Sequence, residues 1–180
     1  MKTVDVTNTI RRALDDSRGD ILAIDPDATT PGAALWTRHD ALARAWGGDA
    51  SGRTLATPDG ARALLESLTP SSVVLVEAPL SGRSPFPQSL HAQAIVRGGW
   101  VWLATLAGHT VIQVPPHAWQ RSVCPTGTRD HKATLKFLAR EWLGLERVNE
   151  DIASALGILR YALDSSGLTW GKCLREPVKP

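Results

Sequence analysis

The sequence predicts a mixed α/β fold, in which an antiparallel hairpin precedes parallel strands and helices cover both faces of the sheet. Two apolar runs, at 20–25 and 72–77, have the length of buried strands, and each ends in an acidic residue. Residues 32–36 form another apolar run directly after a turn-rich segment, which is typical of a hairpin. From residue 57 onward, helical patterns alternate with short strands, and this order favours parallel pairing.

The expected strands are short apolar runs bounded by glycine, proline or polar residues. They cover residues 20–25, 32–36, 53–56, 72–77 and 110–114. Residues 25–31 form the turn of the hairpin, because Pro26 and Pro31 interrupt any periodic pattern. The proline-rich segment 79–87 is expected to form a surface loop directly after Glu77.

The expected helices have apolar residues at helical spacing together with start or stop signals. They cover residues 9–14, 58–67, 88–108, 117–123, 132–143 and 150–164. Thr57 is expected to cap the second helix, Asp130 or Thr128 to start the fifth, and Gly144 to end it. The glycine pair at 98–99 is expected to break or soften the long third helix.

One domain is expected over residues 20–164, which is long enough to bury a core. Residues 1–19 are polar and are expected to form an N-terminal extension, with a short helix capped by Thr7 or Asn8. Residues 165–180 contain glycine, proline and lysine, and they are expected to trail over the surface as a C-terminal tail.

The composition excludes several classes of protein. A net charge of +2 and a pI near 8.7 leave no global basic surface, so any nucleic-acid contact must be local. No apolar run approaches the roughly 18 residues of a membrane span, and the charged N-terminus is unlike a signal peptide. Cys124 and Cys173 lie far apart without metal-binding spacing, which favours a reducing cytosol over a zinc or disulfide framework.

Three acids stand at the edges of predicted core elements. Asp25 and Glu77 each follow an apolar strand, and Asp151 opens a mostly apolar helix. A charge at the end of a buried strand requires a partner or a metal ion. Carboxylate oxygens suit Mg²⁺ or Mn²⁺, and two such ions about 4 Å apart can activate water for attack on phosphorus. The three acids therefore favour a divalent-metal site for phosphodiester hydrolysis.

Each acid also has a simpler explanation. Asp25 precedes a proline and could cap a turn. Glu77 could pair with a loop arginine such as Arg83, and Asp151 could interact with the dipole at the start of its helix. The alternatives weaken when they are taken together, because both strand-end acids follow complete apolar strands and the third acid begins an apolar helix.

Five segments carry a resemblance to a known family, in the same order along the chain. They cover residues 21–35, 73–77, 114–121, 126–133 and 151–156. The first is similar to the opening hairpin of the RuvC-type Holliday-junction resolvases, in the ribonuclease H-like superfamily, and the second resembles their second acidic strand. The last segment, Asp-Ile-Ala-Ser-Ala-Leu, is similar to the Asp-x-x-Asp-Ala-Leu of their terminal helix. The resemblance spans about residues 20–164.

The resemblance implies a ribonuclease H-like fold and a metal-dependent endonuclease that resolves four-way or other branched DNA junctions. Asp25, Glu77 and Asp151 would hold two Mg²⁺ ions per active site, with Mn²⁺ as a substitute. Lys132 would approach the scissile phosphate and stabilise developing charge. Paired nicks, leaving 5′-phosphate and 3′-hydroxyl ends, imply a homodimer. The expected location is the cytoplasm of a bacterial or phage-infected cell.

Three positions depart from the pattern of that family. Asp27 stands where glycine is usual, and Gln120 stands near a usual lysine, whose role Arg121 could take. Ser154 stands where the fourth acid is expected, and Glu150 is the other candidate for that place. Serine is a weak, neutral ligand, whereas Glu150 lies on a different helix face from the acid that follows it. The sequence leaves open which of the two completes the metal site.

Basic and aromatic residues near the acids are candidates for contact with DNA. Lys132 and Lys136 share one face of a predicted helix, which suits the phosphate backbone; a solvated helix face is the alternative. Phe86, in the loop after Glu77, either inserts between bases or packs against its own loop. The full set of candidates is Arg83, Phe86, Arg121, Arg129, His131, Lys132 and Lys136.

Two other functions fit the same residues. A ribonuclease H-like nuclease could act on RNA–DNA hybrids or simple flaps rather than on junctions. A relative weakened by Ser154 could instead bind DNA structures or a partner protein without cutting. The three functions differ in which nucleic acid is cut, if any, so a cleavage assay separates them.

Overall fold

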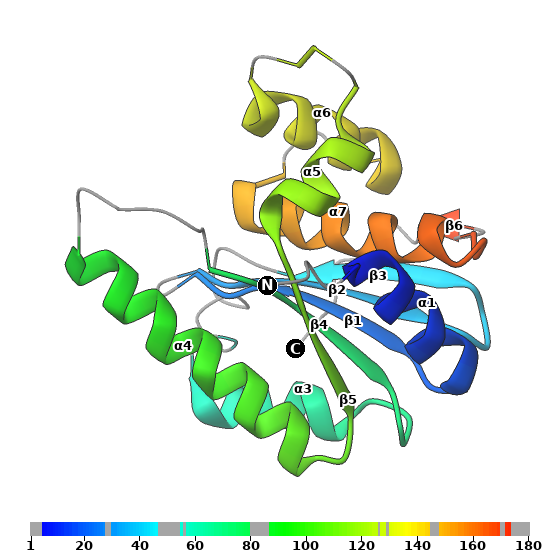
Figure 1. Ribbon diagram of the computed structural model, residues 1–180, viewed down its shortest axis with the longest axis vertical. Coiled ribbons are helices and arrows are strands. Elements are labelled where there is room, and N and C mark those ends of the chain that lie inside the picture. Colours follow the sequence, from blue (N-terminus) through cyan, green and yellow to red (C-terminus); the bar gives the residue numbers. More distant parts are fainter. Residues whose placement is uncertain are drawn as a thin grey trace.

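A twisted six-stranded sheet forms the centre of the protein, with helices on both faces (Figure 1). The computed structural model describes residues 5–27, 30–46, 55, 57–79, 87–125, 127–128, 130–144, 148–169 and 172–173. The strands are β1 (Ile21–Asp25), β2 (Gly32–Thr37), β3 (Leu42–Trp46), β4 (Val73–Glu77), β5 (Thr110–Val114) and β6 (Lys172–Cys173). The order across the sheet is β5-β4-β1-β2-β3-β6.

The sheet is antiparallel on one side and parallel on the other, which confirms the predicted class. β1, β2 and β3 pair in antiparallel succession, whereas β1 pairs with β4 and β4 with β5 in parallel. The helices are α1 (Val6–Asp16), α3 (Pro58–Glu66), α4 (Pro87–Leu106), α5 (Pro116–Val123), α6 (His131–Leu143) and α7 (Glu150–Ser165). Among the described residues, no helix is both long enough and apolar enough to cross a bilayer.

The two faces of the sheet bury separate hydrophobic clusters. Residues of α1, α5, α6 and α7 pack on one face, and residues of α3 and α4 pack on the other. Successive residues of β1 alternate between them, so Ala23 faces the first cluster and Ile24 the second. Burial on both faces explains why β1 and β4 are continuous apolar runs rather than alternating ones.

Most helix boundaries agree with the start and stop signals in the sequence. Thr57 caps α3 by accepting a hydrogen bond from the backbone N–H of Gly60 at 3.1 Å. Asp130 caps α6 in the same way, and Gly144 ends it with a left-handed φ of 61°. The expected break in the third helix is wrong, because α4 runs without interruption through its glycine pair.

Four segments differ from the expectations. The first helix is longer than 9–14, is capped by Asp5 rather than by Thr7 or Asn8, and packs Ile10 against the core. The strand after β2 is β3, whereas the segment expected as a strand, 53–56, lies outside the described residues except for Leu55, which is helical. Within the expected tail, β6 pairs in parallel with β3.

Candidate active site

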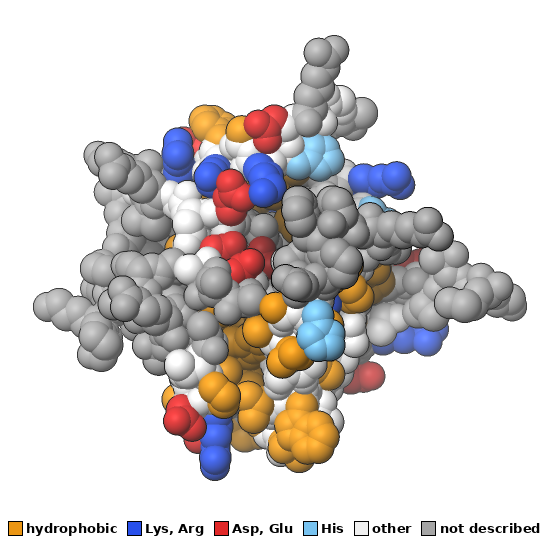
Figure 2. Space-filling model, turned by 90° about the vertical axis from the view of Figure 1, so that its left-hand side faces the viewer, with side chains coloured by type: hydrophobic (Ala, Val, Ile, Leu, Met, Phe, Trp, Pro, Cys, Tyr) orange, Lys and Arg blue, Asp and Glu red, His pale blue; other side chains and the backbone are white. Residues whose placement is uncertain are grey.

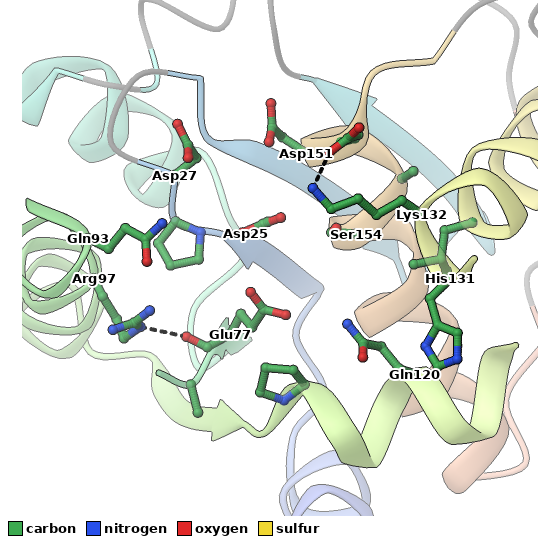
Figure 3. Close-up of a pocket in the computed structure, with 16 residues that line it drawn as sticks. Asp25, Asp27, Glu77, Gln93, Arg97, Gln120, His131, Lys132, Asp151 and Ser154 are labelled. Atoms are coloured by element: carbon green, nitrogen blue, oxygen red, sulfur yellow. Dashed lines mark hydrogen bonds and ion pairs between the residues drawn. The ribbon is translucent and has the colours of Figure 1, made fainter. Parts of the chain in front are cut away.

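The carboxyl ends of two neighbouring parallel strands bring the first two acids together. Asp25 and Glu77 are the last residues of β1 and β4, which pair in parallel, so both reach the same edge of the sheet. The first two turns of α7 add Asp151 and Ser154 at this edge (Figure 3). These four side chains line one pocket. Polar residues that complete its wall include Asp27, Gln93, Arg97, Gln120, His131, Lys132 and Glu150.

A glycine allows α7 to approach the sheet closely enough to form this pocket. Gly32 is the first residue of β2, and it stands opposite Asp25 in the β1–β2 register. A Cβ atom on Gly32 would overlap the carbonyl group of Asp151 and would lie 2.8 Å from the backbone nitrogen of Ile152. Only glycine fits this position without moving the start of α7. The separation between the first and third acids is therefore set by the backbone.

Asp25 and Glu77 point toward each other at the floor of the pocket (Figure 3). Burial, and secondly the charge of Glu77, raise the pKa of Asp25 to about 8, although a hydrogen bond with Ser154 opposes the shift. Burial also raises the pKa of Glu77. At neutral pH the pair must therefore hold a proton or face a cation, because two adjacent carboxylates do not both ionise easily in such a site.

Glu77 is held by two donors from other elements. The indole Nε1–H of Trp119 donates to Glu77 Oε1 at 3.1 Å. The guanidinium Nε–H of Arg97 donates to the backbone carbonyl oxygen of Glu77 at 2.8 Å. Burial lowers the pKa of Arg97, while the charges of Glu77 and Asp25 act in the opposite direction. Arg97 thus places positive charge beside the acid pair.

Thr30 holds two further acids at the rim of the pocket. Its hydroxyl group donates to Asp151 Oδ2 at 2.7 Å, and its backbone N–H donates to Asp27 Oδ1 at 3.1 Å. Burial raises the pKa of Asp151, although the hydrogen bond from Thr30 opposes the shift. Asp27 stands where the RuvC-type resolvases usually have glycine. Here it accepts a hydrogen bond within the turn and also lines the pocket.

Asp25 and Glu77 fit a divalent cation on electrostatic grounds. Their oxygens are hard donors of the kind that Mg²⁺ and Mn²⁺ prefer, and a cation would replace the proton that the pair otherwise holds. Within the described parts of the chain, no three His, Cys, Asp or Glu side chains lie close enough together to share one ion. For Asp151 to join the pair, its side chain would have to turn away from Thr30.

Ser154 and Glu150, the two candidates for the fourth metal ligand, have different partners in the structure. Ser154 lies one turn after Asp151 and hydrogen-bonds to Asp25. Glu150 instead forms ion pairs with Lys132 at 2.8 Å and Lys136 at 3.2 Å. These lysines lower the pKa of Glu150 through hydrogen bonds. In this structure Ser154 is next to the acid pair, and Glu150 is bound to α6.

The candidate DNA-binding residues fall into three groups. His131 and Lys132 line the pocket, and Lys136 lies beside Glu150. Figure 2 shows the same arrangement on the surface, where acidic side chains in the middle of the view have lysine and arginine side chains above them. Arg121 lines a different cavity, with residues of α1 and α7, whereas Gln120 lines the carboxylate pocket. Arg83, Phe86 and Arg129 lie outside the described residues.

Four residues of the site are absent from the candidates that the sequence supplied. They are Thr30, Gln93, Arg97 and Trp119. Gln93 and Arg97 are spaced by four on one helix, and this spacing is a signal that they share a face. The role of Trp119 has no local signal, because its acceptor is 42 residues away in the chain.

The fold is similar to that of two solved RuvC structures. One is T. thermophilus RuvC in complex with Holliday junction substrate, at 18% identity and a TM-score of 0.59, covering 82% of this chain and 94% of that chain. The other is Thermus thermophilus RuvC, at 17% identity and a TM-score of 0.53, covering 82% of this chain and 95% of that chain. No protein-family model matches the sequence, and no curated protein matches it. The likeness establishes the fold, which is the ribonuclease H-like α/β fold that RuvC has.

Proposed function

We propose that the protein is a metal-dependent endonuclease that nicks branched DNA, with four-way junctions as its preferred substrate. The observation that carries the proposal is the pair formed by Asp25 and Glu77 at the ends of adjacent parallel strands, with raised pKa values that favour binding of a cation. The similarity in fold to a RuvC bound to a Holliday junction supports the choice of substrate. The protein would act in the cytoplasm of a bacterial or phage-infected cell.

The acids of the pocket would bind the metal ions, and Lys132 would bind the phosphate. Asp25 and Glu77 would hold Mg²⁺, and Asp151 would complete the site after turning from Thr30. Two ions would, when bound, supply the positive charge that activates a water and stabilises the leaving oxygen. Lys132, with its exposed ammonium group at the rim, would stabilise charge on the phosphate that is cut.

A cleavage assay on a labelled four-way junction tests this function. In the presence of Mg²⁺ or Mn²⁺, we expect paired nicks at symmetric positions, and no nicks from an Asp25→Asn variant. Cleavage restricted to RNA–DNA hybrids or flaps would assign the protein to another class of nuclease. Junction binding without cutting, even with Mn²⁺, would favour a binding protein; the neutral Ser154 beside Asp25 is the observation that keeps this alternative open.

We predict that Glu150→Gln strengthens DNA binding and leaves cation binding unchanged. In the wild type, Glu150 pairs with Lys132, which lines the pocket, and with Lys136, which lies beside it on α6. Freed lysines can contact phosphates, and each new phosphate contact steepens the dependence of log Kd on log salt by roughly 1. Fluorescence anisotropy with a junction at several salt concentrations measures the affinity and the slope.

The control for this variant is Glu141→Gln, which removes one negative charge from the exposed surface of α6. Among the described residues, Glu141 forms no ion pair, so its substitution should change junction affinity only slightly. If Glu150→Gln instead lost Mn²⁺ affinity, Glu150 would be a metal ligand and the ion pairs with the lysines would not persist in the working enzyme.

A homodimer would place two active sites on one junction, and the outer face of α4 supports this part of the proposal. Ile95, Trp102 and Leu106 are 63%, 66% and 70% exposed, at spacings of seven and four residues on one side of the helix. Figure 2 shows hydrophobic side chains gathered below the acidic middle of the molecule. The three side chains offer on the order of 400 Å². That is about half of the roughly 800 Å² that each partner buries in a stable interface.

The glycines of α4 support the proposal that a second helix would pack there. Gly98 and Gly99 are exposed, and an added Cβ on either would meet nothing within 4 Å. Glycine in an exposed helix interior costs about 1 kcal/mol relative to alanine, so two in succession weaken α4 within the subunit. They would allow α4 of a second copy to approach closely, and this uncharged face would not repel itself.

We predict opposite effects of the double variant Gly98→Ala, Gly99→Ala on the subunit and on the dimer. The free energy of unfolding of the monomer should rise by about 1 kcal/mol or more, because alanine is the better helix former and has room. The dimer dissociation constant should rise at least tenfold, because the added methyl groups separate the helices. Sedimentation equilibrium and urea unfolding measure the two effects. A dimer of unchanged or higher affinity would show that the interface lies elsewhere.

A further inference from the structure

We infer that Trp119 is a positioning residue for Glu77, and that Gly157 provides the space for its ring. The inference rests on the proposed function, because it concerns the ion that Glu77 would bind. Trp119 lies on α5, and Glu77 lies at the end of β4, so the contact joins two elements of the pocket. The sequence places these residues 42 positions apart.

The ring of Trp119 is fixed before any ion binds. Its side chain is completely buried, in the same hydrophobic cluster as Leu135 of α6. A Cβ atom on Gly157 of α7 would lie 2.6 Å from Trp119 Cζ3, so the ring occupies the space that a larger residue would need. Because the ring is enclosed by α5, α6 and α7, its N–H group has one direction in which to donate, toward Glu77 Oε1 at 3.1 Å.

This hydrogen bond selects the orientation of the Glu77 carboxylate. Oε1 accepts the indole N–H, and the same carboxylate also hydrogen-bonds to the side chain of Asp25. Arg97 fixes the backbone of the same residue through its carbonyl oxygen. Glu77 therefore has little freedom to lose when a cation binds, and the hydrogen bond also favours the charged form of its carboxylate.

Trp36 provides a matched control for the packing role of a buried tryptophan. It lies on β2, is 3% exposed and belongs to the same hydrophobic cluster as Trp119. Its buried Nε1 atom has no hydrogen-bond partner among the described residues. Phenylalanine at either position removes the N–H and part of the ring, but only at position 119 does it remove a hydrogen bond to the acid pair.

The experiment measures Mn²⁺ binding to the full-length protein by calorimetry, with no DNA present. Loss of a partner that orients a metal ligand costs about 10–100-fold in affinity, so we expect Trp119→Phe to raise the Mn²⁺ dissociation constant by at least tenfold. Trp36→Phe should leave it within about twofold of the wild type. Gly157→Ala, which displaces the ring, should weaken Mn²⁺ binding as Trp119→Phe does.

A second measurement reports the hydrogen bond itself, in the ion-free protein. Among the indole N–H signals in a ¹⁵N correlation spectrum, one should disappear in Trp119→Phe, and the same signal should move in Glu77→Gln. The inference would be overturned if Trp119→Phe had unchanged Mn²⁺ affinity, or if the indole N–H signal of Trp119 did not move in Glu77→Gln. Either result would leave the proposed function unaffected. If the wild type neither binds Mn²⁺ nor nicks a junction, the proposed function fails and the inference fails with it.

Discussion

Asp25→Asn should make the ion-free protein more stable at pH 8 while removing more than about 99% of the nuclease activity that we propose. Burial and the nearby Glu77 raise the pKa of Asp25 to about 8, so an ionised Asp25 weakens the folded state. Asparagine has nearly the same shape and carries no charge. Loss of a partner that only orients a metal ligand costs about 10–100-fold, so loss of the ligand itself should cost more.

The sign of the pH dependence follows from the raised pKa. In the unfolded chain Asp25 releases its proton near pH 4, whereas in the folded protein it keeps the proton up to about pH 8. Between these values the folded state binds more protons than the unfolded state, so the stability of the ion-free wild type falls as the pH rises. Ionisation of Asp25 should lower the free energy of unfolding by several kcal/mol over this pH range. The decrease should be much smaller in Asp25→Asn.

Urea unfolding at pH 5 and pH 8, with and without Mg²⁺, measures this prediction. Mg²⁺ should restore stability to the wild type at pH 8 and have little effect on Asp25→Asn, because a ligand stabilises only the state that binds it. Asp20→Asn is the matched control at the other end of β1. Asp20 is 7% exposed and accepts hydrogen bonds from Thr69 and Arg38, so its substitution should destabilise by about 2 kcal/mol. An Asp25→Asn variant less stable than the wild type at pH 8 would contradict the electrostatic account.

The parts of the site that lie on predicted strands were accessible from the sequence. An apolar run that ends in an acid carries its own signal, and two such runs in parallel must end at one edge of the sheet, as Asp25 and Glu77 do. Asp151 also carried a local signal, because it opens a mostly apolar helix, and the structure has it in the first turn of α7. These inferences needed only local patterns and the geometry of parallel pairing.

The parts that depend on contacts distant in the chain were not accessible. The choice between Glu150 and Ser154 was open because it depends on where α6 lies, and the lysines of α6 bind Glu150. β3 was missed because its sequence, Leu-Ala-Arg-Ala-Trp, lacks β-branched residues and is held as a strand by pairing with β2. β6 has two residues, and no pattern of that length predicts a strand.

Gly32→Ala should cost about 3 kcal/mol or more of unfolding free energy, because its methyl group would overlap the backbone of Asp151. β2 pairs with strands on both sides, and α7 packs against it, so neither backbone can move without loss of other contacts. Gly98→Ala, where nothing lies within 4 Å of the new methyl group, should act in the opposite direction on the monomer. Thermal unfolding of the two variants at low protein concentration compares them directly.

The same substitution tests whether the backbone sets the geometry of the acids. Gly32 stands opposite Asp25 in the sheet and against Asp151 in α7, so relief of the overlap must move these two acids apart. We therefore expect Gly32→Ala to bind Mn²⁺ more weakly at temperatures where the variant is still folded. The hydrogen bond from Thr30 to Asp151 should be lost as well. A folded variant that binds Mn²⁺ as the wild type does would show that Asp151 is not needed for the first ion. Asp25 and Glu77 alone, the pair with the raised pKa values, would then form that ion's site.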